Sequence, residues 1–350
     1  MNSWDVIIAG AGIIGVSTAL ELRERGARVL LLDRGQPGRE ASSAAAGMLS
    51  AFDPETPAGL QNFARECARV YPEFVGKLER ASGISVDLRQ HGAITVENDF
   101  SHEAPPPEYR ELQAVELQRL EPQLNTHGRK AFFVSEGCVD PDLLMQAATR
   151  TAELAGVELK TSVAMHELRA RNGQTEVETS AGTFTSKAAI NCCGAWSGTP
   201  VKPRKGHMLY VQPQQSGLLQ HVFRAADSYI VPRTSGKILL GTTVEDAGFD
   251  KTVLPGTIDT LHAAAARYVP ELADAQVIST WTGLRPGTPD DLPLMGETGT
   301  PGVFLASGHF RNGVLLAPLT ARIMANLVMG KPAGWDISAF SPQRFATRKA

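Results

Sequence analysis

The chain has 350 residues, of which 43% are hydrophobic, and its formal net charge at pH 7 is −3. This length suits two domains with sizeable cores, and the nearly balanced charge argues against nucleic acid or an anionic membrane as a partner. Four cysteines are too few for a disulfide framework, and no His/Cys cluster has metal-ligand spacing, so no metal site is expected.

The sequence also argues against a membrane span. Its apolar stretches are strand length, far below the ~20 residues of a membrane-spanning helix. Residues 1–5 lack the basic start of a signal peptide. We therefore expect a cytoplasmic protein, and its oligomeric state, including a homo-oligomer, is left open.

The first residues carry a glycine-rich motif. Residues 6–9 form a short apolar run typical of a buried parallel strand, and Gly10, Gly12 and Gly15 follow it with G-x-G-x-x-G spacing. In dinucleotide-binding folds these glycines allow a tight turn, close approach of the backbone to pyrophosphate, and close contact between helix and strand. Packing alone could also explain the three glycines.

The residues after this motif complete the pattern. Residues 16–25 are predicted to form a helix that ends at Gly26, and residues 28–33 a second strand. The free N–H groups of the helix favour phosphate, and Asp33, 18 residues after Gly15, is placed to bind ribose hydroxyls. The acid disfavours NADP, but the motif does not separate NAD from FAD.

The rest of the chain alternates between helical and strand patterns. Further helices are predicted over residues 60–82, 112–120, 143–155, 257–268 and 314–329. Strands are predicted over residues 87–96 (two pieces), 132–139, 157–161, 164–185 (a meander), 188–191, 205–250 (several) and 303–306. The fold class is therefore α/β, an open Rossmann-like sheet interrupted twice by antiparallel insertions.

Several shorter segments have individual interpretations. Asp140 is the predicted N-cap of the helix over 143–155, with a proline in its first turn. Residues 101–108, with three consecutive prolines, predict an exposed loop. The small residues at 41–48 let the backbone approach something flat or crowded, although a linker or a helix start would have the same composition. The adjacent cysteines at 192–193 are interpreted as buried small residues rather than a redox pair.

From residue 43 onward the chain resembles the D-amino-acid oxidase superfamily, and within it the glycine oxidase branch linked to thiamine synthesis. The matching blocks are collinear and cover nearly the whole length: residues 43–49, 194–197, 205–206, 229–233, 283–288 and 308–313. This resemblance implies a discontinuous FAD-binding domain of residues 1–84, 137–200 and 283–350. It also implies a mainly antiparallel substrate-binding domain of residues 85–136 and 201–282.

The resemblance implies oxidation of glycine, sarcosine or small D-amino acids with molecular oxygen as acceptor. Two alternatives remain open: a D-amino-acid dehydrogenase with another electron acceptor, and a flavin-binding module without turnover. Some members of the superfamily attach the flavin through a histidine near the first small-residue run or a late cysteine. This chain has no histidine before residue 91 and no cysteine after Cys193, so non-covalent FAD is expected.

The resemblance and the glycine motif together give a set of site residues. The expected FAD contacts are Gly10, Gly12, Ile13, Ile14, Gly15, Asp33, Arg34, Ser42, Ala46, Gly47, Met48, Val163, Gly194, Trp196, Gly308, His309, Phe310, Arg311, Asn312, Gly313, Val314 and Leu315. The expected catalytic residues are Tyr229, Arg285 and Arg311. Two residues near the expected pocket, Asp227 and Val244, depart from the family, and Asp33 stands where its glycine oxidase branch has glutamate.

The chemistry of the proposed catalytic residues fits this assignment. Arg285 lies in a Gly-Leu-Arg-Pro-Gly segment, predicted to be a turn, and a guanidinium binds carboxylate through two parallel hydrogen bonds. Tyr229 could place its hydroxyl on the same carboxylate. Arg311 precedes a helix N-terminus, which would stabilise an anionic reduced flavin. Each residue also has a competing interpretation: Arg285 as a surface arginine, Tyr229 as a half-buried strand residue, and Arg311 as part of a salt bridge that only fixes its turn. His309 is interpreted as a packed histidine rather than a base.

Overall fold

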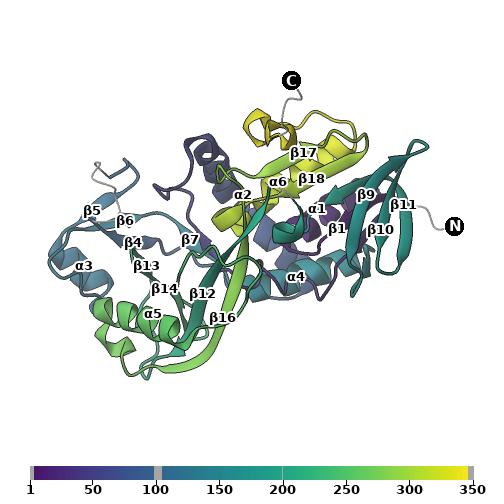
Figure 1. The fold of residues 1–350 in the computed structure, drawn as a ribbon. Helices are drawn as coiled ribbons and strands as arrows, with labels where there is room; N and C mark the ends of the chain where they lie inside the picture. Colours follow the sequence, from purple (N-terminus) through teal and green to yellow (C-terminus); the bar gives the residue numbers. More distant parts are fainter. Residues whose placement is uncertain (1–3, 98–104, 199, 346–350) are drawn as a thin grey trace.

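The structure is a computed structural model that describes residues 4–97, 105–198 and 200–345. Two eight-stranded sheets dominate it, joined by the long strands that run diagonally through Figure 1. Of the predicted exposed loop at 101–108, residues 101–104 lie outside the described part. Within the described part, no helix is long and apolar enough to span a membrane.

The first sheet has the predicted parallel centre. Its strand order is β17-β18-β11-β1-β2-β8, with the antiparallel β9 and β10 continuing from β11. All neighbours along the central order are parallel except β17, which pairs antiparallel with β18. The strands are β1 (Trp4–Ala9), β2 (Val29–Leu32), β8 (Glu158–Lys160), β9 (Met165–Arg171), β10 (Gln174–Thr179), β11 (Gly182–Asn191), β17 (Leu294–Glu297) and β18 (Val303–Ser307).

Alternation along β1 divides the core on the two faces of this sheet. Val6 and Ile8 pack into a core shared with four helices, whereas Ile7 packs against the meander of β9–β11. The four helices are α1 (Ile13–Glu24), α2 (Ala58–Ser82), α4 (Pro141–Leu154) and α6 (Gly313–Val328). The sheet is therefore covered by helices on one face and by its own antiparallel extension on the other (Figure 1).

Local signals in the sequence explain where these helices begin and end. The carboxylate of Asp140 accepts hydrogen bonds from the backbone N–H groups of Asp142 (2.9 Å) and Leu143 (3.2 Å), which confirms the predicted N-cap of α4. Gly26 has φ = +86°, a conformation that glycine adopts without strain, and it ends the turn after α1.

The second sheet is mainly antiparallel. Its order is β16-β12-β15-β14-β13-β4-β6-β5, with one parallel pair between β13 and β4. The strands are β4 (Ala93–Val96), β5 (Arg110–Leu112), β6 (Ala131–Val134), β12 (Lys202–Gln212), β13 (Val222–Ala225), β14 (Ser228–Pro232), β15 (Ile238–Gly241) and β16 (Gln276–Gly287). α5 (Pro255–Tyr268) and α3 (Ala114–Leu120) pack against one face, and the other face contributes to the cavity described below.

Three details differ from the sequence prediction. The expected strand over 132–139 is two strands, β6 and β7 (Gly137–Cys138), and β7 pairs with β3 (Met48–Leu49) in a small separate sheet. β17 was not predicted. The segment around Arg285 is not a turn but the end of β16, which pairs with β12 from Gln276 to Gly287. Pro286 is tolerated there because β16 is an edge strand. Its partner in the β12 pairing is Pro203, so neither of the two paired residues has a backbone N–H to donate.

The two sheets correspond to the two expected functional halves. Strands of the predicted FAD-binding segments form the first sheet and the small β3–β7 sheet, while the second sheet is built from the predicted substrate-binding segments and the end of β16. The predicted boundary between residues 282 and 283 falls inside β16. The division into two domains stays a prediction.

Candidate active site

A cavity of about 820 Å³ lies where the two sheets meet, and this size suits an elongated organic ligand. Nineteen of the residues expected to contact the cofactor line it: Gly10, Gly12, Ile13, Ile14, Asp33, Arg34, Ser42, Ala46, Gly47, Met48, Val163, Gly194, Trp196, His309, Phe310, Arg311, Asn312, Gly313 and Val314. Tyr229 and Arg285 line it as well. Segments from both ends of the chain therefore contribute to one cavity.

Three expected contacts do not line the cavity, and each has a packing role. A Cβ on Gly15 would lie 1.9 Å from the carbonyl oxygen of Gly10, so this glycine allows α1 to approach β1. Gly308 has φ = +74°, and a Cβ there would meet a methyl group of Thr288 at 2.6 Å. Leu315, in the first turn of α6, points into the hydrophobic core and is buried there.

The glycine motif lies at one end of the cavity, called the nucleotide end here because the sequence predicts a dinucleotide there. Gly10 has φ = +104°, and a Cβ there would lie 2.3 Å from the carbonyl oxygen of Cys192, so it is required by packing. A Cβ on Gly12 would meet only the hydroxyl of Ser42, at 3.0 Å. Gly12 therefore leaves open space at the N-terminus of α1, and α1 has no acidic residue in its first turn to oppose a phosphate.

Asp33 is held in position at the end of β2. One carboxylate oxygen accepts a hydrogen bond from the backbone of Ala11 (2.7 Å) and the other from that of Gly35 (2.8 Å). Asp33 borders the cavity, and its predicted role in binding ribose hydroxyls stays a prediction. Next to it, Arg34 stacks over the ring of Trp196 with 3.5 Å between its Cζ and the ring centroid.

The small residues at 41–48 line one wall of the cavity. They form neither a helix nor a loose linker, the two alternatives that their composition left open. A Cβ on Gly47, where φ is +73°, would lie 1.9 Å from the carbonyl oxygen of Val139. The buried guanidinium of Arg233, from the second sheet, donates hydrogen bonds to the carbonyl oxygens of Ala46 (2.6 Å) and Val139 (3.0 Å). The run is thus fixed between the two sheets.

The start of α6 also lines the cavity. Gly313 begins the helix, its first turn has no acidic residue, and Asn312 precedes it. Arg311 donates a hydrogen bond to Glu55 and lies 3.9 Å from Asp53, so the turn-fixing salt bridge exists in this structure. Whether Arg311 also acts on a cofactor stays a prediction.

His309 is packed rather than poised as a base. Its ring is buried and lies 3.2 Å from the hydroxyl of Thr320. Burial lowers the pKa of His309 to about 3, so the imidazole is neutral at physiological pH. The adjacent Cys192 and Cys193 border the cavity as free thiols, the first buried and the second partly exposed. Desolvation raises the pKa of Cys193 to about 12, which makes a reactive thiolate unfavourable.

Arg285 lies at the end of the cavity formed by the second sheet. Its guanidinium donates hydrogen bonds to the carbonyl oxygen of Thr243 (3.1 Å) and the hydroxyl of Thr242 (2.8 Å). Among the residues that the structure describes, no carboxylate pairs with it. Burial lowers the pKa of Arg285, Tyr229 opposes this shift, and the nearby cation of Arg311 adds to it.

Tyr229 lies beside Arg285, and its hydroxyl interacts with Arg285 and Thr242. Burial raises the pKa of Tyr229, so the phenol stays protonated and can donate a hydrogen bond. Two glycines make room for these side chains. A Cβ on Gly206 would lie 2.2 Å from Arg285 Nη1, and one on Gly241 would lie 2.4 Å from the Tyr229 ring.

Arg224 is a charged residue of the cavity that was not predicted from the sequence. It lies opposite Tyr229 in the β13–β14 pairing, borders the cavity, and is 3.0 Å from the buried carboxylate of Glu136. The alternation along residues 222–225 could have placed it on the same face as Tyr229. Of the two departures noted from the sequence, Val244 borders the cavity, but Asp227 does not and instead pairs with Arg267.

Within the described ranges, no group of His, Cys, Asp or Glu is arranged to hold a metal ion. The groups that line the cavity are instead those of an organic site. One end offers glycines, a helix N-terminus and an acid, and the other offers a guanidinium and a phenol. This arrangement can hold a dinucleotide along its length and a small carboxylate at the second sheet.

Comparison with known proteins agrees with this geometry. The family described as FAD dependent oxidoreductase matches residues 5–327. A glycine oxidase of Pseudomonas aeruginosa is 32% identical over 96% of this chain and 98% of its own length. A bifunctional ThiO/ThiG protein of Trichormus variabilis is 33% identical over 97% of this chain, which spans only 55% of that relative. The crystal structure of glycine oxidase from Geobacillus kaustophilus superposes with a TM-score of 0.92 at 32% identity, covering 98% of this chain and 99% of that one.

Proposed function

Since this chain belongs to the FAD dependent oxidoreductase family, we propose that it is an oxidase of glycine or of another small amine that carries a carboxylate. The observation that supports this substrate class is the unpaired guanidinium of Arg285 in the cavity wall. A largely buried cation is costly unless it has an ionic partner, so the site favours an anionic ligand. Nearly full-length similarity to glycine oxidases points to the same class.

The residues of the cavity fit FAD. The N-terminus of α1 and the space left by Gly12 would hold the pyrophosphate, Asp33 the ribose, and the start of α6 the flavin end. Two independent helix N-termini without acidic residues therefore face one cavity. When bound, FAD supplies the hydride acceptor for the substrate and returns the electrons to an external oxidant.

The protein side of the reaction is mainly positioning. Arg285 would bind the carboxylate through its planar fork, and the phenol of Tyr229 would donate to the same group. This fixes the substrate α-carbon relative to the cavity wall, which is the main contribution a protein makes to such a transfer. The neutral, packed His309 is not required as a base.

The proposed reaction removes two electrons and two protons from the amine and passes them to oxygen. The substrate loses a hydride from its α-carbon and a proton from its amine, which leaves an imine. Water then hydrolyses the imine to a 2-oxo acid and ammonia or an amine. Molecular oxygen takes up the two electrons and two protons and leaves as hydrogen peroxide. Glycine, sarcosine and small D-amino acids are the substrates we expect.

A peroxide-coupled screen tests this proposal. Purified holoprotein is offered glycine, sarcosine, proline and pairs of D- and L-amino acids, with benzylamine as an amine that lacks a carboxylate. We expect peroxide from glycine or sarcosine and none from benzylamine. Substrate-dependent reduction of an artificial electron acceptor without peroxide would instead indicate a dehydrogenase, and no turnover with any compound would contradict an enzyme of this class.

A further inference from the structure

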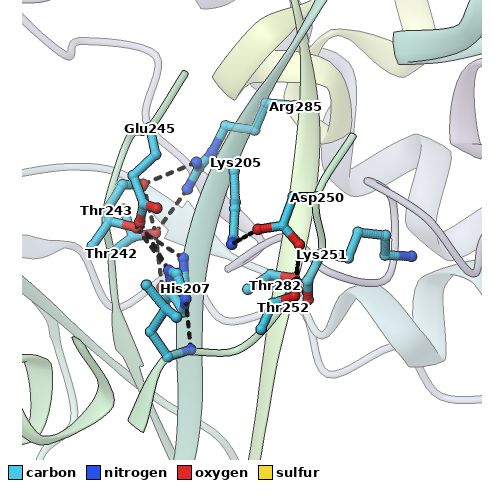
Figure 2. A network of polar contacts seen from close by, with 11 residues as sticks. Lys205, His207, Thr242, Thr243, Glu245, Asp250, Lys251, Thr252, Thr282 and Arg285 are labelled. Carbon is cyan, nitrogen blue, oxygen red and sulfur yellow. Dashed lines mark hydrogen bonds and ion pairs between the residues drawn. The ribbon is translucent and has the colours of Figure 1, made fainter. Parts of the chain in front are cut away.

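The orientation of Arg285 depends on the segment that follows β15. Thr243 accepts one guanidinium hydrogen bond with its backbone carbonyl, and Thr242 accepts another with its hydroxyl. Figure 2 shows both acceptors beside the guanidinium, with a second layer of polar side chains behind them. The residues of that second layer, His207 and Glu245, hydrogen-bond to Thr242 and Thr243.

His207, on β12, is at the centre of this second layer (Figure 2). Its side chain is fully buried. Nε2 lies 3.1 Å from the backbone N–H of Leu254, which can only donate, so Nε2 carries no hydrogen. Nδ1 therefore carries the hydrogen of a neutral imidazole, and it lies 2.9 Å from Oε1 of Glu245. One tautomer satisfies both partners.

The same residue anchors both acceptors of Arg285. The backbone N–H of His207 donates to the hydroxyl of Thr243 (3.1 Å), and that hydroxyl donates to Oε1 of Glu245. The hydroxyl of Thr242 donates to the backbone carbonyl of His207 (3.0 Å). Glu245 thus receives hydrogen bonds from both His207 and Thr243, and its own backbone pairs with Lys205 of β12 in both directions at 2.9 Å.

The imidazole does not itself border the cavity. Among the described residues, the hydrogen-bond partners of the ring are Thr243, Glu245 and the backbone of Leu254. An effect of the His207 ring on substrate binding would therefore pass through Thr243, whose hydroxyl the ring contacts and whose carbonyl accepts from the guanidinium.

We propose that His207 is a positioning residue that sets the orientation of Arg285 through Glu245 and Thr243. The inference rests on the proposed function, in which Arg285 binds the substrate carboxylate. A buried, single-tautomer imidazole is suited to this task because it has fixed donor and acceptor directions and no flexible tail. Its loss should disturb carboxylate binding more than FAD binding or folding.

Two near-isosteric substitutions separate the two ring nitrogens. In His207→Asn the side-chain amide can occupy the position of Nδ1 and keep the donor to Glu245. In His207→Gln the amide reaches the position of Nε2 and loses that donor. A matched control is His262→Gln, in a histidine whose ring contacts the carbonyl of Leu272 (2.7 Å) and does not border the cavity.

The test measures glycine kinetics and the binding of glycolate, a carboxylate that cannot be oxidised as an amine, followed by the flavin absorbance. We expect His207→Gln to raise the KM for glycine and the Kd for glycolate about tenfold, as for the loss of one buried hydrogen bond. FAD content and thermal unfolding should match those of His262→Gln. His207→Asn should stay within about threefold of wild type, because it keeps the donor.

A purely structural role would give a different pattern. Equal effects of Asn and Gln at position 207, or wild-type KM and Kd in His207→Gln, would overturn the inference while the wild-type enzyme still oxidised glycine. A wild-type protein that neither binds glycolate nor oxidises any amine would overturn the proposed function, and this inference with it.

A second pair of variants keeps the test decisive if the His207 variants do not fold. Thr243→Ser retains the hydroxyl between His207 and Glu245, and Thr243→Ala removes it. We expect Thr243→Ala to raise the Kd for glycolate and Thr243→Ser to leave it near wild type. Equal values for the two variants would overturn the inference.

Discussion

Gly206 on β12 leaves the space that the guanidinium of Arg285 occupies, because a Cβ there would lie 2.2 Å from Nη1 and 2.7 Å from Cζ. The two residues lie on neighbouring strands, with Gly206 paired to Gly283. The position of Arg285 at this end of the cavity therefore requires a glycine at position 206.

Gly206→Ala should therefore displace Arg285 while leaving the nucleotide end intact. The new methyl group cannot coexist with the present guanidinium position, so the side chain must rotate and lose its bonds to Thr242 and Thr243. We expect a rise in the KM for glycine on the order of tenfold or more, with normal FAD content. The control is Gly256→Ala in α5, where a Cβ meets nothing within 4 Å; equal kinetics in the two variants would contradict this view of the pocket.

Arg285→Ala should weaken carboxylate binding far more than flavin binding. Losing a charged partner in a desolvated site costs on the order of 2–5 kcal/mol. Arg285→Lys should recover only part of this, since a point charge cannot replace the planar fork. The measurement is the Kd for glycolate in each variant, and unchanged binding in Arg285→Ala would show that the carboxylate lies elsewhere.

Gly12→Val should abolish FAD binding without preventing folding. Gly12 faces the cavity and its Cβ would meet only the Ser42 hydroxyl, whereas Gly10 and Gly15 are enclosed by backbone. The valine side chain would occupy the place expected for the pyrophosphate. Flavin content is measured on protein shown by circular dichroism to be folded, and a stoichiometric amount of FAD would mean that the nucleotide end is misplaced.

Acid should destabilise the fold through His309. Its pKa is about 3 in the folded chain because of burial, and 6.5 is the ordinary value. As the pH falls, the imidazole therefore takes up a proton in the unfolded chain before it does so in the folded chain. The contribution of the neutral imidazole to stability is fully present above about pH 6.5 and decreases below that pH. The free energy of unfolding should fall by roughly 1.4 kcal/mol per pH unit from this group between about 6.5 and 3.

Urea unfolding of wild type and His309→Gln at pH 7, 6 and 5 measures that contribution. The variant lacks the titrating group, so its free energy of unfolding should depend less on pH. Parallel pH dependence in the two proteins would show that His309 is not the responsible group.

The sequence predicted most where local chemistry determines the structure. Gly10, Gly12 and Asp33 follow a fixed spacing around one strand–helix–strand unit, and the N-cap of Asp140 is read from adjacent residues. Nineteen expected cofactor residues line one cavity because most of them lie in such units or in the blocks that resemble the family.

Prediction failed where long-range pairing decides. Arg285 lies between glycines and a proline, which favour a turn, but pairing of β16 with β12 imposes an extended strand. His207 has its side-chain partner Glu245 far along the chain, so no motif or spacing marked it. Arg224 likewise belongs to no motif, and only the alternation along β13 could have placed it beside Tyr229. β17 consists of only four residues and is held at the sheet edge by its pairing with β18.

Anaerobic mixing of the holoprotein with glycine tests the central claim most directly, because it separates hydride transfer from the later reaction with oxygen. We predict that glycine bleaches the visible flavin absorbance of the wild-type protein, and that admitting oxygen restores the colour with one peroxide per flavin. Arg285→Ala should bleach only at much higher glycine concentration. If glycine, sarcosine and the D-amino acids all leave the wild-type flavin oxidised, the assignment as an oxidase of small amino acids is wrong.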